Sequence, residues 1–170
     1  MDVTARARAV RLAIFDVDGV LTDGTIYMGP AGEAFKAFNI LDGHGIKMLQ
    51  SAGVAIAIIS GRSSEAVARR AEELAIVHVV QGSKDKVADF RQVIKGLGVA
   101  AQACAFVGDD LPDLAVMRAC GFAVAVANAA DAVKAQAHYL TTASGGRGAV
   151  REFCDLVLRA QGQLEPAAAV

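Results

Sequence analysis

The sequence predicts an α/β domain built on a doubly wound, open parallel sheet of the Rossmann-like kind. Short apolar runs alternate with amphipathic stretches along most of the 170 residues, as strands and helices do in such folds. Apolar residues make up 54% of the chain, yet no apolar run approaches the roughly 18 residues that a membrane-spanning helix needs. The mean hydropathy of +0.40 therefore fits a sheet buried between Ala-rich helices, in a single domain over residues 1–170.

Five apolar runs have the length and composition of strands, at residues 12–15, 54–60, 76–80, 103–108 and 122–126. Amphipathic patterns typical of helices lie between them, most clearly at 63–75 and 84–98. Strands and helices that alternate in this way form right-handed βαβ units. Ligands of such sheets bind beyond the carboxyl ends of the strands, so the residues that directly follow each strand matter most.

Residues 23–39, "DGTIYMGPAGEAFKAFN", depart from this alternation and predict two strands around a "GPAG" turn, a β-hairpin insertion at about 24–39. An isolated hairpin is barely stable in water. This one must therefore pack either against its own domain or against copies from other subunits. Near the C-terminal end we expect a helix and tail at about 148–170, with the last residues frayed. The large apolar side chains of the hairpin are Ile26, Tyr27, Met28, Phe35 and Phe38.

Composition excludes several classes of protein. The net charge is −1 and no basic block is present, so the electrostatic signature of a nucleic-acid-binding protein is missing. The apolar patch near the N-terminus is too short for a signal peptide and runs directly into acidic residues. Cys104, Cys120 and Cys154 are odd in number and widely spaced, which argues against a disulfide framework and a zinc site. We expect a cytoplasmic protein with no membrane partner.

Polar residues that could carry out chemistry follow three of the predicted strands. Because the carboxyl ends of parallel strands meet at one edge, we expect these side chains to converge there. Mg²⁺ prefers one or two carboxylates together with water and phosphate oxygens, so the rim suits phosphoryl transfer with Mg²⁺. A lysine would come from "GSKDK", which offers Lys84 and Lys86. The rim residues are Asp16 and Asp18 after the first strand, Ser60 after the second, and Asp109, Asp110 and Asp113 after the fourth.

Four ordered motifs, "DVDGVLTDG", "ISGR", a downstream lysine and "GDDLPD", resemble those of the haloacid dehalogenase superfamily over roughly residues 12–115. The resemblance implies that Asp16 is a nucleophile that forms an aspartyl phosphate, and that Asp18 is the general acid and base. It also implies that Ser60 and Lys86 hold the phosphoryl oxygens. Mg²⁺ would be bound by Asp16, Asp109 and the main-chain carbonyl of Asp18, with Asp110 and Asp113 in support.

The segments between the motifs hold only the hairpin, single helices and one strand, so they leave no room for a cap domain. Such a chain, with "DGTIYMGPAGEAFKAFNILDGHGIKML" and "GGRGAVREFCDLVL", closely resembles the capless phosphatases that act on 3-deoxy-D-manno-octulosonate 8-phosphate in lipopolysaccharide synthesis. The resemblance implies a homotetramer whose hairpins form a central barrel and whose neighbouring subunit supplies part of a lid. Arg147 of "GGRG" is a candidate for that lid, although this segment could also be a flexible lead into the last helix.

The same resemblance implies a set of substrate-binding residues. The sequence departs from the family where Leu41 and Lys47 stand, positions at which arginine is frequent, and where His44 replaces an aromatic residue. These departures bear on how the sugar carboxylate would be recognised. The set consists of Asp18, Asn39, Ile40, Leu41, Asp42, Gly43, Lys47, Gly61, Arg62, Arg70 and Lys86.

Other interpretations of these residues remain open at the level of sequence. The substrate could be a nine-carbon, sialic-acid-type sugar phosphate. A phosphoacceptor signalling domain also places acids, a hydroxyl and a lysine on the rim of a doubly wound sheet, although its acceptor typically follows the third strand. Ser60 could cap the next helix, and Arg62 and Arg70 could be solvated. A scaffold without activity is disfavoured, because no motif residue is missing.

Overall fold

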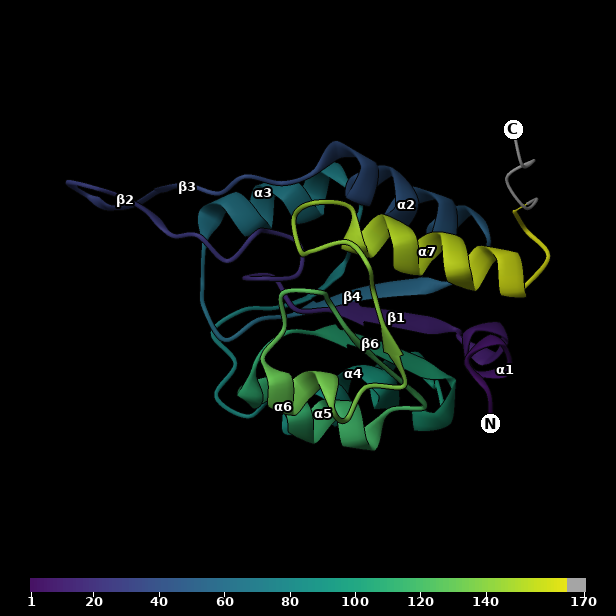
Figure 1. Cartoon of the computed structure of the whole chain (residues 1–170). Helices are drawn as coiled ribbons and strands as arrows, with labels where there is room; N and C mark the ends of the chain where they lie inside the picture. Colours follow the sequence, from purple (N-terminus) through teal and green to yellow (C-terminus); the bar gives the residue numbers. More distant parts are fainter. Residues whose placement is uncertain (165–170) are drawn as a thin grey trace.

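The predicted α/β fold is confirmed. The computed structural model describes residues 1–164 and contains a six-stranded parallel sheet with helices on both faces (Figure 1). The predicted frayed tail at 165–170 lies outside the described residues. Across the sheet the strands follow the order β5-β4-β1-β6-β7-β8. The strands are β1 (Leu12–Phe15), β4 (Ala55–Ile59), β5 (His78–Val80), β6 (Cys104–Gly108), β7 (Phe122–Ala125) and β8 (Tyr139–Leu140).

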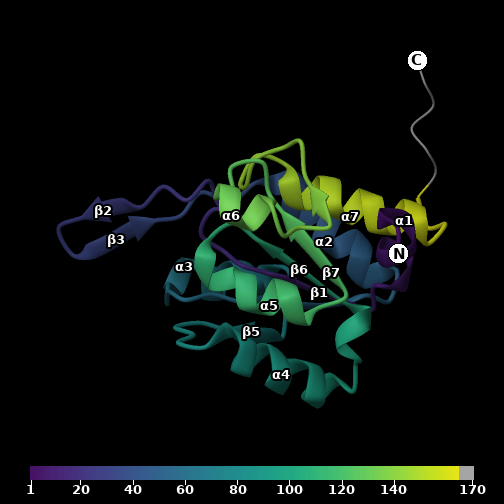
Figure 2. The same cartoon turned by 60° about the horizontal axis from the view of Figure 1, so that its bottom comes forward.

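The helices form two layers, one on each side of the sheet (Figures 1 and 2). In Figure 1 the upper layer consists of α2 (Ile40–Ser51), α3 (Glu65–Glu73) and α7 (Ala149–Ala160). The lower layer consists of α4 (Lys86–Leu97), α5 (Leu114–Ala119) and α6 (Asp131–Lys134), and the short helix α1 (Val3–Ala9) packs against α7. Two 3₁₀ turns, η1 (Ala101–Ala103) and η2 (Leu111–Asp113), flank β6. No helix among residues 1–164 is both long and apolar enough to cross a membrane.

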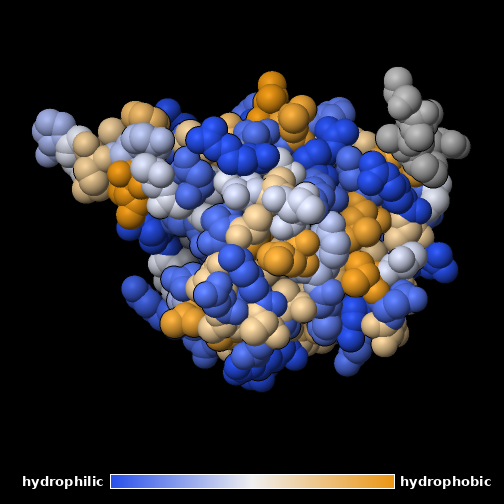
Figure 3. Space-filling model, viewed as in Figure 1, coloured by the Kyte–Doolittle hydropathy of each residue, from blue (hydrophilic) through white to orange (hydrophobic). Residues whose placement is uncertain are grey.

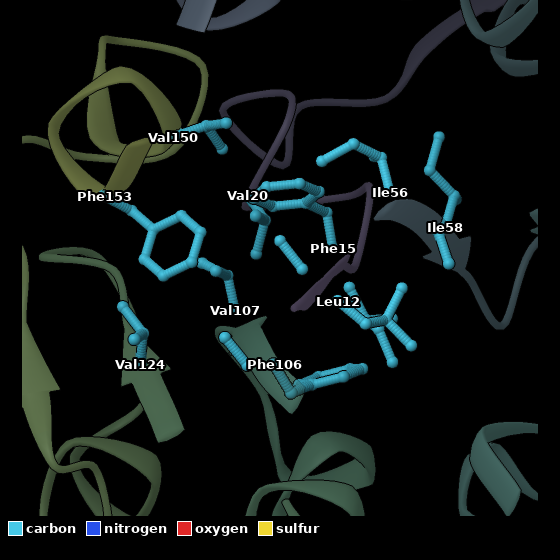
Figure 4. Close-up of a cluster of buried hydrophobic side chains, with 14 of the residues drawn as sticks. Leu12, Phe15, Val20, Ile56, Ile58, Phe106, Val107, Val124, Val150 and Phe153 are labelled. Carbon is cyan, nitrogen blue, oxygen red and sulfur yellow. The ribbon is translucent and has the colours of Figure 1, made fainter. Parts of the chain in front are cut away.

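Strand β1 lies at the centre of the sheet and is buried along its whole length. It pairs in parallel with β4 on one side and with β6 on the other. Phe15 at its end meets the ring of Phe153 from α7 edge to face, with centroids 5.7 Å apart (Figure 4). The end of β1 is thus held in the core against α7, and the N–H of the next residue, Asp16, donates to the carbonyl oxygen of Val107 in β6 at 3.1 Å.

The predicted hairpin is formed by β2 (Tyr27–Gly29) and β3 (Gly32–Phe35), and it projects away from the body of the domain (Figures 1 and 2). The rings of Tyr27 and Phe35 stack with centroids 4.4 Å apart. Even so, Met28 is 69% exposed and Phe35 is 55% exposed, so the domain itself does not cover them. Figure 3 shows the hydrophobic colour on the projecting hairpin.

Several short elements were not predicted from the sequence, among them helix α1 and strand β8. Helix α1 begins after Asp2, whose carboxylate accepts a hydrogen bond from the main-chain N–H of Ala5 at 2.7 Å. At seven residues it is too short for a periodic pattern to be distinctive. Strand β8 has only two residues, and it is set by pairing with β7 rather than by its own composition. Strand β5 also begins later than predicted, because Val77 is exposed and unpaired in the sheet.

The loop before α7 packs closely against the turn that follows β1. The main-chain N–H of Gly146 donates to the carbonyl oxygen of Val20 at 3.0 Å. A Cβ atom on Gly145 would lie 1.8 Å from the carbonyl oxygen of Gly19. The turn that carries Asp18 is therefore supported by direct main-chain contact with the loop before α7.

We predict that Gly145→Ala weakens this contact. The added methyl group forces the loop and the turn apart, which should lower the free energy of unfolding by about 1–3 kcal/mol. Urea unfolding at one protein concentration measures the change. Gly96→Ala in α4 is the matched control, because no atom lies within 4 Å of its added methyl group. That control should gain about 0.5–1 kcal/mol. Equal stability of the two variants would show that Gly145 is not tightly packed.

Candidate active site

The carboxyl ends of β4, β1 and β6 lie side by side, and an open cleft of about 300 Å³ lies beyond them. The structure thus brings the predicted rim residues together from three strands and from the start of α4. The neighbours Gly24 and Pro112 also line the cleft. The predicted residues that line it are Asp16, Asp18, Ser60, Gly61, Arg62, Lys86, Asp109, Asp110 and Asp113.

Asp16 and Lys86 form the innermost ion pair of the cleft. The Nζ atom of Lys86 lies 2.9 Å from Oδ2 of Asp16 and 2.7 Å from Oδ1 of Asp113, and all three side chains are at most 10% exposed. Burial, together with the negative charge of Asp113, raises the pKa of Asp16 to about 6, although Lys86 opposes the shift. Asp16 and Asp113 thus share one ammonium group, so these three side chains together carry an excess of negative charge.

Asp109 adds a further carboxylate to this excess of negative charge. Burial and the charges of Asp16 and Asp113 raise its pKa to about 7. In the described part of the chain, its Oδ1 atom is a buried oxygen with no hydrogen-bond partner. Because an unpaired buried carboxylate oxygen is costly, this atom indicates a missing ligand. A Cβ atom on Gly19 would lie 2.0 Å from Oδ2 of Asp109, so the close approach of turn and carboxylate requires glycine there.

The donor set fits Mg²⁺. One carboxylate oxygen each from Asp16, Asp109 and Asp113 lie within 4.8 Å of one another. Asp113 is the poorest ligand of the three. Its Oδ1 atom is paired with Lys86, and its Oδ2 atom accepts the main-chain N–H groups of Asp109 at 2.9 Å and Asp110 at 3.3 Å. Asp16 and Asp109 are therefore the side chains with oxygen atoms to offer a hard cation, and Asp113 holds the other groups in place.

Asp18 stands on the outer side of the cleft in a separate cluster of charges. Its Oδ1 atom is paired with Nζ of Lys36, and its Oδ2 atom lies 3.6 Å from Nε of Arg62. Glu33 contacts both cations, at 3.1 Å from Lys36 and 3.3 Å from Arg62, and it accepts a hydrogen bond from the hydroxyl of Ser64. The sequence analysis missed Lys36, Glu33 and Ser64. The sequence offered one hint of their role. Glu33 and Lys36 belong to the hairpin insertion, which directly follows the first motif, and Ser64 lies just after "ISGR".

Part of the predicted substrate-binding set lies elsewhere. Within residues 1–164, the cleft of the same subunit does not include Asn39, Ile40, Leu41, Asp42, Gly43, Lys47 or Arg70. Their role as substrate ligands therefore stays a prediction.

The structure gives several of these residues other contacts. Asn39 caps α2 by accepting from the main-chain N–H of Leu41 at 2.8 Å. Asp42 is buried and accepts from the main-chain N–H of Arg151 in α7 at 2.8 Å. Arg70 pairs with Glu73 at 2.8 Å.

The remaining members of the set lie in α2, where Gly43 is buried and the others are partly or fully exposed. Lys47 lines a hollow between α2 and the end of α7, and the exposed Ile40 and Leu41 form the beginning of α2. Gly43 packs against the side chain of Arg70. Arg147 is exposed and lies 3.4 Å from Asp23, on the loop before α7.

The comparisons with known proteins agree with this geometry. A profile of the haloacid dehalogenase-like hydrolases matches residues 73–153. The 3-deoxy-D-manno-octulosonate 8-phosphate phosphatase of Escherichia coli K12 is 48% identical over 166 residues, which cover 98% of this chain and 88% of that protein. The crystal structure of the phosphatase of that name from Yersinia pestis has a TM-score of 0.94 and 47% identity, and the match covers 96% of this chain and 88% of that one.

A further solved structure carries ligands. The 3-deoxy-D-manno-octulosonate 8-phosphate phosphatase from Moraxella catarrhalis, in complex with magnesium ion, phosphate ion and KDO, has a TM-score of 0.91 and 45% identity, and the match covers 94% of this chain and 91% of that one. The doubly wound sheet and the carboxylates at the ends of β1 and β6 define a hydrolase of the haloacid dehalogenase type. The identity over nearly the full length shows that the chain belongs to the family of the 3-deoxy-D-manno-octulosonate 8-phosphate phosphatases.

We predict that Asp109→Asn stabilises the metal-free protein at high pH. A carboxyl whose pKa rises from 3.8 to about 7 on folding binds more protons folded than unfolded, so its contribution to stability is lost as the pH rises towards 7. In EDTA at pH 8 the variant should unfold roughly 2–6 °C above wild type, and the gap should narrow at pH 4. Thermal unfolding by circular dichroism measures this.

Asp131→Asn, at a fully exposed carboxylate in α6, is the control and should leave both melting temperatures unchanged. With excess Mg²⁺ the order should reverse, because only wild type keeps both carboxylate ligands. If the difference in melting temperature between Asp109→Asn and wild type does not change with pH, the pKa of Asp109 is not raised by folding, and the prediction is wrong.

Proposed function

We propose that the protein hydrolyses 3-deoxy-D-manno-octulosonate 8-phosphate to the free sugar acid and inorganic phosphate, as a Mg²⁺-dependent step of lipopolysaccharide synthesis. The observation that carries the proposal is the buried Asp16, 2.9 Å from Lys86 and beside the unpartnered oxygen of Asp109. The near-full-length identity to phosphatases of this name supplies the substrate class. The bound magnesium, phosphate and KDO of the Moraxella structure support the same assignment.

The carboxylates of Asp16 and Asp109 and the main-chain carbonyl of Asp18 would hold Mg²⁺. A carboxylate about 4 Å from a phosphoryl dianion is repelled by roughly 8 kcal/mol at an effective dielectric constant near 20. When bound, the cation offsets a repulsion of that size and neutralises charge on the phosphoryl oxygens. Lys86 and Ser60, whose side chains face the same cleft, would hold the remaining oxygens.

With this repulsion offset, Asp16 can act as the nucleophile. Its free carboxylate oxygen attacks phosphorus, the bond from phosphorus to the sugar oxygen breaks, and an aspartyl phosphate forms. Asp18 gives a proton to the departing sugar oxygen. A water molecule next loses a proton to Asp18 and attacks phosphorus, and the bond to Asp16 breaks to release phosphate. Two moderate barriers thus replace the single large barrier of direct hydrolysis.

The substrate would be recognised by residues of one subunit's cleft together with residues of a neighbouring subunit. Arg62 at the rim is 47% exposed and can reach a bound sugar acid. The cleft is open to solvent, so water must be excluded by something other than a cap domain. The exposed apolar side chains of the hairpin favour assembly into a homotetramer, in which residues 39–43, Lys47, Arg70 and Arg147 would border the substrate of the same or a neighbouring subunit. The three free, buried cysteines fit a cytoplasmic location.

We predict that Asp16→Ala abolishes turnover without unfolding the protein, because Lys86 keeps its second partner Asp113. Loss of the nucleophile should reduce phosphate release by at least about 10³-fold. Continuous phosphate assays with the eight-carbon and a nine-carbon sugar acid phosphate measure the effect and rank the two substrates. Asp131→Asn is again the control. Near-wild-type activity of Asp16→Ala would refute the mechanism, and release that stops at one equivalent in wild type would instead indicate a phosphate relay.

We also predict that the hairpin drives assembly. Phe35→Glu places a charge among exposed apolar side chains and should convert the tetramer into smaller species. Val77→Glu, at an exposed apolar position before β5, is the control and should remain tetrameric. Sedimentation equilibrium measures both. A tetrameric Phe35→Glu variant would place the interface elsewhere, and a monomeric wild-type protein would refute the proposed assembly.

A further inference from the structure

Lys36 is the least exposed cation of the outer cluster. Its side chain is 2% exposed although it follows β3 directly and belongs to the connection between the projecting hairpin and α2. Its Nζ atom contacts Oδ1 of Asp18 and lies 3.1 Å from Oε2 of Glu33. A lysine in a hairpin insertion is normally solvated. Because burial of an ammonium group is costly without carboxylate partners, these two contacts are what keep it buried.

Glu33 anchors this lysine to the body of the domain. It accepts a hydrogen bond from the hydroxyl of Ser64, which lies at the N-cap position of α3. A serine at that position ordinarily bonds to the helix main chain. Here its side chain makes no capping hydrogen bond and serves Glu33 instead. The hydrogen bond from Ser64, followed by the contacts with Lys36 and Arg62, lowers the pKa of Glu33 and keeps it ionised. The return strand of the hairpin is therefore tied to α3.

Arg62 differs from Lys36 although both contact Asp18 and Glu33. Its side chain is 47% exposed, and its Nε atom lies 3.6 Å from Asp18, beyond hydrogen-bond distance. Its hydrogen bond to Glu33 at 3.3 Å is made from a half-exposed side chain, so Arg62 can turn towards a ligand at the rim more easily than Lys36 can. Lys36 has no such freedom, because it is enclosed and engaged on both sides. Arg62 is thus the cation that can bind substrate, and Lys36 is the cation that holds the carboxylate of Asp18.

We propose that Lys36 is a positioning residue for Asp18, held in place by Glu33, and that the return strand of the hairpin thereby forms part of the catalytic apparatus of its own subunit. The inference rests on the proposed function, in which Asp18 passes a proton to the leaving sugar oxygen. A proton donor must be held within hydrogen-bond distance of that oxygen, and the contact with Lys36 fixes the orientation of the Asp18 carboxyl. Without it, one oxygen of Asp18 loses its partner and the side chain can rotate.

The test compares leaving groups. A sugar alkoxide needs a proton from Asp18 as it departs, whereas 4-nitrophenolate does not. The ratio kcat/KM reports the steps up to departure of the leaving group. For Lys36→Met we expect kcat/KM to fall by about 10–100-fold on the sugar phosphate and by less than about threefold on 4-nitrophenyl phosphate. Asp18→Asn should show the same selectivity with a larger loss. Lys95→Met, at an exposed lysine of α4, is the control and should change neither value.

Three further measurements separate positioning from other roles. Lys36→Arg should recover most of the lost activity, because a guanidinium group can pair with both carboxylates. Inhibition by inorganic phosphate should be unchanged within about twofold in Lys36→Met, since a positioning residue does not bind the phosphoryl group. Arg62→Met should instead raise KM for the sugar phosphate. Sedimentation and thermal unfolding confirm that each variant is folded and assembled as wild type is.

If Lys36→Met does not fold, Glu33→Gln replaces it, because that variant keeps the lysine and removes its anchor. It should show the same preference for the nitrophenyl substrate. Equal losses on the two substrates, in Lys36→Met or in Glu33→Gln, would overturn the proposal, as would a tenfold weaker inhibition by phosphate. These outcomes are distinct from failure of the proposed function, which is read from the wild-type enzyme alone. A wild type that releases phosphate from 4-nitrophenyl phosphate but not from the sugar phosphate would refute that function.

Discussion

The concentration of negative charge at the ends of β1 and β6 is the constraint on which the rest of the site depends. Asp16 and Asp113 share the single ammonium group of Lys86, and one carboxylate oxygen of Asp109 lies within 4.8 Å of one from each of them. Burial and mutual repulsion raise the pKa of Asp16 and of Asp109, which means that the folded protein holds these carboxylates against a considerable cost. The fold keeps them there because their strands are buried over their full length. A divalent cation can offset this excess of negative charge and so allow an anionic phosphoryl group to approach.

Several segments around the sheet hold the turn after β1 and its carboxylates in place. Gly19 allows the turn after β1 to lie against Asp109, and Gly145 allows the loop before α7 to lie against the other side of the turn. The side chain of Asn128 bridges the two segments, since it donates to the carbonyl oxygen of Gly19 at 3.0 Å and accepts from the N–H of Gly145 at 2.6 Å. On the solvent side, Lys36 of the hairpin connection contacts Asp18 and is itself held by Glu33 of β3. The catalytic turn is thus supported by three segments that are distant in sequence.

The sequence was sufficient to predict the part of the site that follows from strand ends. Asp16, Ser60 and Asp109 were found because apolar runs mark where strands stop, and parallel strands stop at one edge. Lys36 could not be found in that way, because its burial depends on how the hairpin folds back, and local pattern gives a hairpin lysine no reason to be buried. The serine at position 64 carries an ordinary capping signal, and only the structure shows its hydroxyl directed to Glu33. The predicted ligands in residues 39–43 and at Arg70 lie away from the cleft of their own subunit, a placement that depends on tertiary packing and on assembly.

The most direct test of the central claim is a crystal structure of the protein grown with Mg²⁺ and orthovanadate, which mimics phosphorus under attack. One oxygen of Asp16 should bond to vanadium, and its other oxygen should coordinate Mg²⁺ together with Asp109, at about 2.0–2.1 Å from the metal. Lys86 should reach the vanadate while keeping its contact with Asp113. A structure in which vanadate occupies the cleft but Asp16 remains turned to Lys86, with no metal between the two carboxylates, would contradict the claim.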